Sequence, residues 1–513
     1  MKISRREFLE KTGKGIVAAT LLPAFLKFEP LKNLDIGKQS FLSLKDYCDL
    51  FNVDEKIISK AISVAIDKGG DYCDIYFQFQ TSSFIAMEDN RVNRAFGDVI
   101  LGAGIRVVIG DQTGYCYTEE ITKETLIKAA QTASEIAKGT KKSKPVKLKT
   151  SEKPSYYKAE IKLEDLSVDK RMNYLINLNE KILSLDKRIV KTNIGLSAES
   201  NYIMVATSEG KILSDYQPMI YINARITAEQ NGKKEYNGAA LAKRAGFEAL
   251  NEDNLNFIAK EAVDRTMILF DAIKPKAGEM EVVLAAGGSG ILLHEAIGHG
   301  MEADFNRKGT SIFSDKIGKK VAENFVSIVD DGTVEGSRGA INFDDEGNES
   351  QKTFLVENGI LKSYMHDYIS AKYYKVKPTG NGRRESFKYY PLPRMRNTYM
   401  LPGPHKKEEI IESVKYGILC ETFTNGQVLI GPGDFTFYVK NGYLIENGKI
   451  TAPIKDVNII GNGPKVLADI SMVADDFKFD DGTWTCGKDG QSVPVSLGMP
   501  TVKVNSITVG GVN

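Results

Sequence analysis

Two histidines and a glutamate lie close together in the segment LLHEAIGHGMEADF, residues 292–305. Glu295 directly follows His294, and four residues separate His294 from His299. Neutral imidazoles bind Zn²⁺ at about 2.0–2.1 Å, and bound zinc activates water and polarises a carbonyl. A glutamate beside a ligand can accept a proton from that water and pass it to a leaving amine. The chain has only 4 histidines in 513 residues, so this grouping predicts a metal site rather than two hydrogen-bonded helix histidines.

The spacing of the two histidines is one residue longer than the H-E-x-x-H of common zinc peptidases. Residues five apart on a regular helix diverge by about 140° around its axis, so His294 and His299 would not share a face. One extra residue accommodated as a π-bulge restores the shared face, and such bulges favour functional sites. Gly298 precedes the second histidine, where we expect a wide backbone excursion to be least costly.

A catalytic zinc site uses three protein ligands, so a third ligand is needed. Glu302 and Asp304 are near in sequence, although either could simply cap the helix end. Cys486, in WTCGKDGQSVPV, lies in a glycine-rich turn beside predicted strands, and a thiolate binds zinc well. A free cysteine is otherwise a small buried hydrophobic residue. The residue chemistry leaves these alternatives open.

The metal motif lies where EVVLAAGGSGILLHEAIGHG predicts a strand, a glycine loop and a helix. Upstream, the pattern predicts two helices and two strands in one compact α/β unit. Downstream, four Asn-Gly pairs flanked by apolar or alternating segments predict hairpins. These pairs are Asn358-Gly359, Asn425-Gly426, Asn441-Gly442 and Asn447-Gly448.

The predicted fold class is therefore α+β, with an N-terminal α/β region and a β-rich catalytic domain. That domain is expected to be antiparallel, barrel-like or sandwich-like, and to carry a short zinc-binding helix. The predicted divisions are a signal and linker at 1–40, an N-terminal α/β domain at 41–145, a linker and middle α/β segment at 146–275, and the β-rich domain at 276–513.

Composition excludes several classes of function. Lys+Arg number 68 and Asp+Glu 67, so there is no basic excess for binding nucleic acid. No apolar run reaches the roughly 20 residues of a membrane span. The cysteines Cys48, Cys73, Cys116, Cys420 and Cys486 are odd in number, widely spaced and form no C-x-x-C, so a disulfide framework is not expected.

The first residues predict export. Arg5 and Arg6 precede the short apolar run IVAATLLPAFL, and SRREFL resembles the twin-arginine signal of bacteria. We therefore expect a periplasmic or cell-envelope protein. Contact with a membrane is expected only through this segment, if it is not cleaved.

Five stretches of the sequence carry a resemblance to a known family. They are HEAIGHGMEADFNRKGTSIFSDKIG, DDGTVEGSRG, GNGRRESFKYYPLPRMRNTYMLPG, TNGQVLIGPGDF and CGKDGQSVPV. Through them the chain resembles the TldD half of the TldD/PmbA family of zinc metallopeptidases, over nearly everything after the signal.

The resemblance implies one zinc ion per active subunit, with His294, His299 and Cys486 as ligands and Glu295 as the catalytic residue. It also implies a dimer, either a homodimer or a heterodimer with a PmbA-like subunit, and a peptide substrate. The export signal departs from the familiar members, which are cytoplasmic. We expect a zinc-dependent peptidase acting on unfolded or extended peptides, with a substrate-binding set that the sequence leaves unknown.

Two alternatives remain at this stage. A dipeptidyl-peptidase III type also carries H-E-x-x-G-H, but its largely helical catalytic region disagrees with the Asn-Gly hairpins. A non-catalytic partner or scaffold subunit would hold a structural zinc with four closed ligands. Arg383 and Arg384, adjacent in GNGRRES, could engage a peptide carboxylate or neighbouring backbone, or could lie at the surface or a subunit contact, and neither role is assigned.

Overall fold

The computed structural model describes residues 42–137, 139, 147–151, 153–429 and 431–511. The predicted export segment with Arg5 and Arg6 lies outside the described residues. Among the residues described, no helix is both long enough and apolar enough to cross a membrane.

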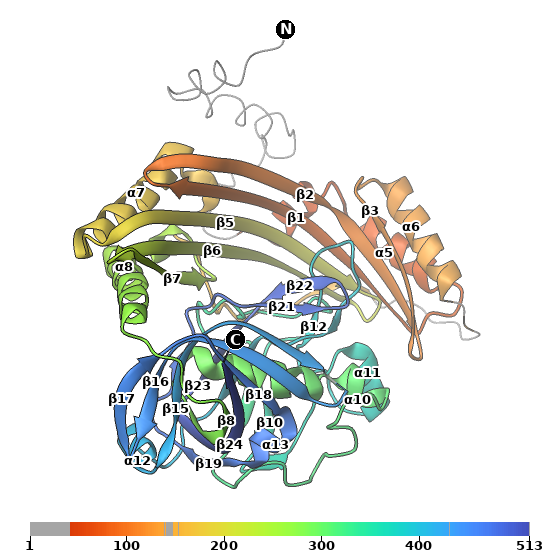
Figure 1. Ribbon diagram of the computed structural model, residues 1–513. Coiled ribbons are helices and arrows are strands. Elements are labelled where there is room, and N and C mark those ends of the chain that lie inside the picture. The colour runs from red at the N-terminus through yellow and green to blue at the C-terminus, as the bar shows by residue number, and fades with distance from the viewer. Residues whose placement is uncertain (1–41, 138, 140–146, 152, 430, 512–513) are drawn as a thin grey trace.

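A seven-stranded sheet forms the upper part of the molecule (Figure 1) and is antiparallel except for one short parallel pair, β4 with β6. Its path runs β3-β2-β1-β5-β6-β4, with β7 also paired to β6. The strands are β1 (Tyr72–Glu88), β2 (Arg91–Ile109), β3 (Gln112–Thr118), β4 (Lys149–Thr150), β5 (Ile189–Thr207), β6 (Lys211–Gln230) and β7 (Lys233–Lys243).

Helices pack at both ends of this sheet, α7 and α8 at one end and α5 and α6 at the other (Figure 1). They are α4 (Leu44–Leu50), α5 (Glu55–Ile66), α6 (Lys123–Ile136), α7 (Val168–Leu185) and α8 (Glu252–Met267). Each buries one apolar stripe, as the helical periodicity of the sequence predicts; in α5, for example, Ile58, Ala61, Ile62 and Ala65 are buried. Strands from both predicted N-terminal segments share this one sheet, and the predicted domain boundaries themselves stay predictions.

The C-terminal region is built on a β-barrel. Strands pair in the order β15-β8-β24-β18-β16, and β16 also pairs with β15, which closes the ring. β17 adds to β16 and β19 adds to β24. The strands are β8 (Gly278–Leu284), β15 (Tyr416–Leu429), β16 (Asp434–Glu446), β17 (Lys449–Ile454), β18 (Val457–Asn462), β19 (Ile470–Val473) and β24 (Val502–Gly511).

A six-stranded sheet, β11-β10-β9-β14-β23-β20, and two small hairpins, β12–β13 and β21–β22, complete this region. Their bounds are β9 (Ile328–Asp331), β10 (Lys352–Glu357), β11 (Ile360–Leu361), β12 (Gly382–Arg383), β13 (Leu392–Pro393), β14 (Asn397–Met400), β20 (Lys478–Phe479), β21 (Thr485–Lys488), β22 (Gln491–Pro494) and β23 (Ser496–Met499). Short helices are α10 (Ala303–Arg307), α11 (Tyr368–Tyr374), α12 (Lys407–Glu412) and α13 (Gly463–Ala468). The predicted fold class, α+β with a β-rich, mainly antiparallel C-terminal domain, is confirmed.

The Asn-Gly predictions have mixed outcomes. Asn358-Gly359 and Asn447-Gly448 form the predicted tight turns, with positive φ at both residues. The predictions at Asn425-Gly426 and Asn441-Gly442 are wrong, because these pairs lie inside β15 and β16. A Cβ at residue 442 would lie 2.3 Å from the Leu419 carbonyl oxygen, so this glycine permits close approach of neighbouring strands.

Buried ion pairs join the upper sheet to the C-terminal region. Asp74 on β1 lies 2.6 Å from Arg106 and 2.9 Å from Arg384, and Arg106 also lies 2.7 Å from Glu346. All four side chains are fully buried there. The GNGRRES segment, which contains β12 and Arg384, thus holds the small hairpins β12–β13 and β21–β22 against the upper sheet. These hairpins lie between the two parts of the molecule (Figure 1).

Candidate metal centre

The two histidines lie on a distorted helix that follows β8. Gly287, with φ 95°, turns the chain from the strand into a short 3₁₀ turn, η4 (Gly288–Gly290), and then into α9 (Ile291–Leu293). The next turn, η5 (His294–Gly298), is π-helical and is followed by a 3₁₀ turn, η6 (His299–Met301). The π turn predicted from the long histidine spacing is therefore present.

The role predicted for Gly298 is wrong. Its φ of −60° and ψ of −50° are ordinary helical values, so no wide backbone excursion occurs there. A Cβ at this position would instead lie 2.2 Å from the Met395 sulfur. Glycine is needed because the helix packs closely against the segment between β13 and β14.

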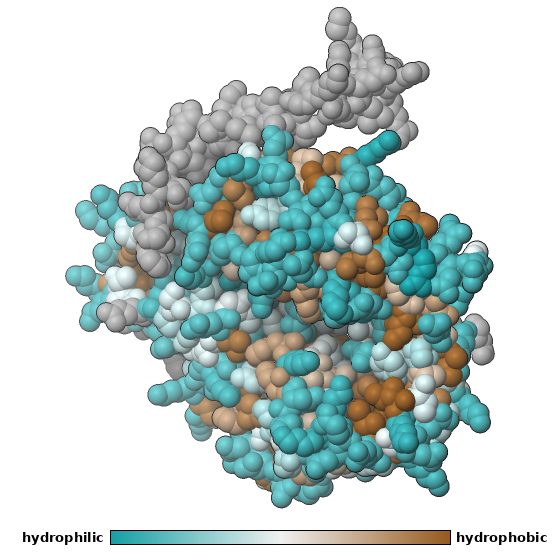
Figure 2. Space-filling model, turned by 90° about the vertical axis from the view of Figure 1, so that its left-hand side faces the viewer, coloured by the Kyte–Doolittle hydropathy of each residue, from teal (hydrophilic) through white to brown (hydrophobic). Residues whose placement is uncertain are grey.

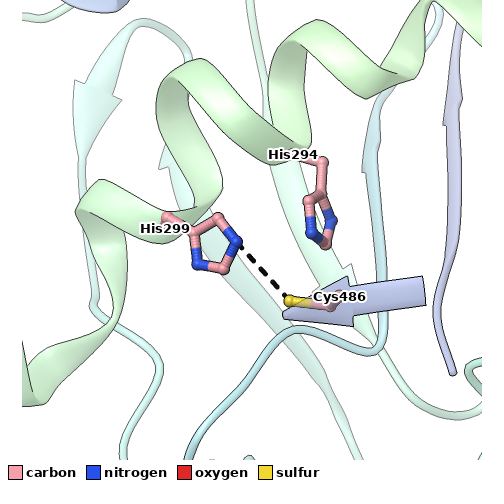
Figure 3. A group of neighbouring side chains, drawn as sticks. All are labelled: His294, His299 and Cys486. Atoms are coloured by element: carbon pink, nitrogen blue, oxygen red, sulfur yellow. Dashed lines mark hydrogen bonds between the residues drawn. The ribbon is translucent and has the colours of Figure 1, made fainter. Parts of the chain in front are cut away.

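The structure brings His294, His299 and Cys486 together (Figure 3). One donor atom from each lies within 4.8 Å of the other two, and the three residues are 2%, 4% and 1% exposed. Cys486 Sγ lies 3.5 Å from His299 Nε2. Tetrahedral zinc with Zn–N and Zn–S bonds of about 2.0–2.3 Å places its donor atoms about 3.3–3.8 Å apart. The distance between Cys486 and His299 lies in this range, and a donor set of two imidazoles and one thiolate fits zinc.

Cys486 has the electrostatics of a metal-binding thiolate. Burial raises the pKa of the Cys486 thiol, but the neighbouring His294 and His299 outweigh this effect and hold the pKa well below its ordinary value. His294 Nδ1 is buried and has no hydrogen-bond partner among the described residues. A buried polar atom left unpaired is costly, which is consistent with a group that lies outside the chain itself.

Glu302 lies behind His299 rather than among the donor atoms. Its Oε2 lies 3.0 Å from His299 Nδ1, which leaves Nε2 directed at Cys486. A carboxylate that accepts from the outer ring nitrogen fixes the tautomer and orientation of a ligating histidine. Asp304 pairs with Lys488 at 2.8 Å and also lies outside the donor group.

Lys488 is a residue of this centre that the sequence analysis missed. It lies two residues after Cys486 on β21 and points to the same buried side. Its Nζ lies 3.1 Å from Glu302 and 2.8 Å from Asp304, and its side chain is 2% exposed. The available signal was strand alternation, which places Lys488 on the same face as Cys486. The acidic partners of a buried lysine are not visible in the sequence.

Two arginines hold the hairpin that carries Cys486. Arg394 donates from Nη2 to the Cys486 carbonyl oxygen at 2.6 Å. Arg383 donates to the carbonyl oxygens of Met395 at 2.5 Å and Pro494 at 2.8 Å. Arg383 therefore binds neighbouring backbone, which was one of the alternatives left open for it. Arg384 binds the buried carboxylate of Asp74.

Glu295 is placed to reach the space in front of the donors. Its Oε2 lies 4.0 Å from His299 Nε2, and its side chain is 23% exposed. All other residues from 287 to 304 except Gly288 are buried, and the structure describes this whole segment. The carboxylate therefore combines contact with solvent and closeness to the donor atoms.

Comparison with known proteins agrees with this geometry. Three family models match in order along the chain: PmbA/TldA metallopeptidase domain 1 over 73–137, the central domain over 161–270 and the C-terminal domain over 277–511. The chain belongs to the PmbA/TldD metallopeptidase family. It is accordingly a metallopeptidase, as its curated relatives are named.

Among those relatives, a metalloprotease TldD homolog of Buchnera aphidicola is 42% identical over 450 residues, covering 86% of this chain and 93% of the relative. A zinc metalloprotease TldD homolog of Saccharolobus solfataricus is 28% identical and covers 88% and 99%.

Solved structures share the fold. A putative modulator of DNA gyrase from Thermotoga maritima has a TM-score of 0.72 at 20% identity, covering 89% of this chain and 100% of that one. TldE from Thermococcus kodakarensis has a TM-score of 0.69 at 20% identity, with the same coverage.

Proposed function

We propose that the protein is a zinc-dependent peptidase that cleaves unfolded or extended peptides. His294, His299 and Cys486 hold the zinc ion, and Glu295 is the acid–base residue. The observation that carries the proposal is the close grouping of three buried donor atoms beside one partly exposed carboxylate. When bound, zinc supplies Lewis acidity that polarises a peptide carbonyl and activates water.

Glu295 moves the proton in this scheme. Its carboxylate accepts a proton from water as the water oxygen attacks the carbonyl carbon. The carbon–nitrogen bond then breaks, and the same carboxyl group returns the proton to the leaving amine. Glu302 contributes indirectly, because its bond to His299 Nδ1 keeps Nε2 free for the metal.

Glu295→Gln tests this assignment. The amide keeps nearly the same shape but accepts no proton, so zinc content stays near stoichiometric while hydrolysis of an unfolded peptide falls about 10²–10⁴-fold. Zinc is measured by mass spectrometry and cleavage by chromatography. A variant that cleaves as fast as the parent protein contradicts the mechanism. Loss of zinc from it would show that Glu295 binds the metal.

A scaffold role with structural zinc is the competing reading. A structural site is closed by four protein ligands. The group found among the described residues has three, and Glu295 beside it has contact with solvent. These two features favour catalysis.

We further infer that the active form is a dimer, either of this chain or with a PmbA-like subunit. Support comes from the family membership and from the fold shared with TldE. Light scattering and activity measured over a dilution series test this inference. A monomer with full activity at every concentration contradicts it.

We also infer export by the twin-arginine route, from Arg5 and Arg6 before a short apolar run. Replacing both arginines with lysine is expected to leave the protein in the cytoplasm, as judged by cell fractionation. Delivery to the periplasm or envelope by the doubly substituted protein would reject this route.

A further inference from the structure

An open recess of about 480 Å³ lies between α8 and the barrel rim. Figure 2 shows this side of the molecule, where the surface is hollowed between the upper sheet and the C-terminal region. We call it the α8 recess; residues that define it are Phe257, Glu261, Arg265, Glu421, Phe423 and Trp484. The mechanism above uses none of them.

Both elements that carry the metal donors contribute to the wall of the α8 recess. Gly287 and Gly288 line it at the start of the histidine helix, and Trp484 lines it two residues before Cys486. Two residues of extended chain span about 7 Å. The recess therefore adjoins the candidate metal centre.

One face of the histidine helix leads from the recess to Glu295. Gly288 and Glu295 are seven residues apart, which on a helix is nearly two full turns and about 10 Å along one face. The 3₁₀ turn that begins at Gly288 has about three residues per turn, which leaves the two residues within about 40° of each other around the axis. These two residues are also the ones in 287–304 that are not buried. A peptide extended along this face would place a residue two or three positions from the scissile bond in the recess.

The charges in the recess leave one carboxylate without a partner. Arg265 is already paired, with Glu261 at 2.9 Å and Asp481 at 3.6 Å. Glu421 on β15 is half-buried and forms no hydrogen bond or ion pair with the described residues. Lys407 and Lys478 also line the recess. Burial raises the pKa of Glu421, although Lys407 and Arg265 act against this, so Glu421 would gain from a closer cation.

Aromatic side chains line the same recess as this carboxylate. The recess is lined by Phe257, Phe423, Tyr443, Phe479 and Trp484. Aromatic faces attract ammonium and guanidinium groups and also accommodate an apolar stem. A free carboxylate among aromatic rings suits a cation carried on a hydrocarbon chain better than it suits an anion or a purely apolar group.

We propose that the α8 recess binds a cationic group of the peptide substrate and that Glu421 determines this specificity. The cation is a lysine or arginine side chain, or the N-terminal ammonium of the peptide. The proposal rests on the peptidase function above and narrows its substrate class to basic peptides.

The test compares peptides that differ in one charge. An unstructured decapeptide carries lysine at successive positions, each matched by norleucine, and each peptide is made with a free and an acetylated N-terminus. The zinc-loaded protein is expected to prefer lysine about tenfold in kcat/KM at one position, and Glu421→Gln to abolish most of this preference. If acetylation removes the preference instead, the ammonium is the bound cation.

Glu412→Gln is the matched control, because Glu412 is an exposed carboxylate on α12 that forms no side-chain hydrogen bond among the described residues. It is expected to keep the wild-type ratio. Binding of the same peptides to zinc-loaded Glu295→Gln, measured by fluorescence anisotropy, tests the recess without hydrolysis. If peptide binding depends on Glu421 but the parent protein cleaves none of the peptides, the peptidase function is refuted. The cation-binding role of the α8 recess would then still stand. Equal kcat/KM and affinity for lysine and norleucine peptides, or an unchanged preference in Glu421→Gln, overturns the proposal.

Discussion

Lys488→Met should weaken both zinc binding and folding. The substitution removes the cation that lies between Glu302 and Asp304 and leaves two buried carboxylates facing each other. Removing one partner from a buried ion pair costs about 3–5 kcal/mol of stability. Loss of the outer support of a ligating histidine typically lowers metal affinity about 10–100-fold.

The pKa of Glu302 gives an independent estimate of the same effect. Burial raises this pKa, but Lys488, His299 and Arg394 together outweigh it and lower the pKa from 4.5 to about 2. A difference of about 2.5 pKa units corresponds to about 3 kcal/mol. Because the folded pKa is the lower one, this stability is fully present above pH 4.5 and is lost as the pH falls toward 2. In Lys488→Met the folded pKa of Glu302 rises, so the stability lost between pH 4.5 and 2 should become smaller.

The assay is zinc affinity by competition with a chelator, together with urea unfolding across this pH range. Lys362→Met is the matched control, because Lys362 pairs with Glu357 at the surface, with both side chains more than 40% exposed. Its expected effect is within about 1 kcal/mol. If Lys488→Met unfolds too readily to assay, adding Asp304→Asn should restore part of the stability. Wild-type zinc affinity and stability in Lys488→Met would refute the reasoning.

Three further outcomes are expected. Cys486→Ala should lose stoichiometric zinc by mass spectrometry, because two histidines alone leave the site incomplete; retained zinc would place the third ligand elsewhere. Burial lowers the pKa of His366 from 6.5 to about 4, against a smaller effect of Asp367. Because this pKa is lower in the folded state, stability should fall by up to about 3 kcal/mol between pH 6.5 and 4, and urea unfolding of His366→Gln should lack this slope. Arg394→Met removes the bond to the Cys486 carbonyl oxygen, and chelator competition should show about tenfold weaker zinc binding.

Much of the metal centre could be predicted from local sequence. The five-residue spacing of His294 and His299 required a π turn, because ordinary helical geometry separates the two rings. Cys486 was harder, since residue chemistry alone gave no reason to prefer it over Glu302. That choice depends on a contact between residues 187 positions apart.

Other features depend on tertiary context. Lys488 and Arg394 act through buried partners that no local pattern marks. Asn441-Gly442 has the composition of a tight turn, yet it continues β16, because the Asn441 side chain bonds to the Arg265 carbonyl oxygen at 2.9 Å and Gly442 admits the neighbouring strand. Asn231-Gly232 forms the β6–β7 turn, with positive φ at both residues, and it was available from the same rule.

The distance in sequence between His299 and Cys486 has a consequence during synthesis. A ribosome adding about 5–20 residues per second needs roughly 10–40 s to pass from one to the other. Through that interval the nascent chain carries two of the three donors and no thiolate to complete the set. A chain released early, or cut before β21, therefore keeps the two histidines without the thiolate. The donor set is therefore complete only after nearly full-length translation.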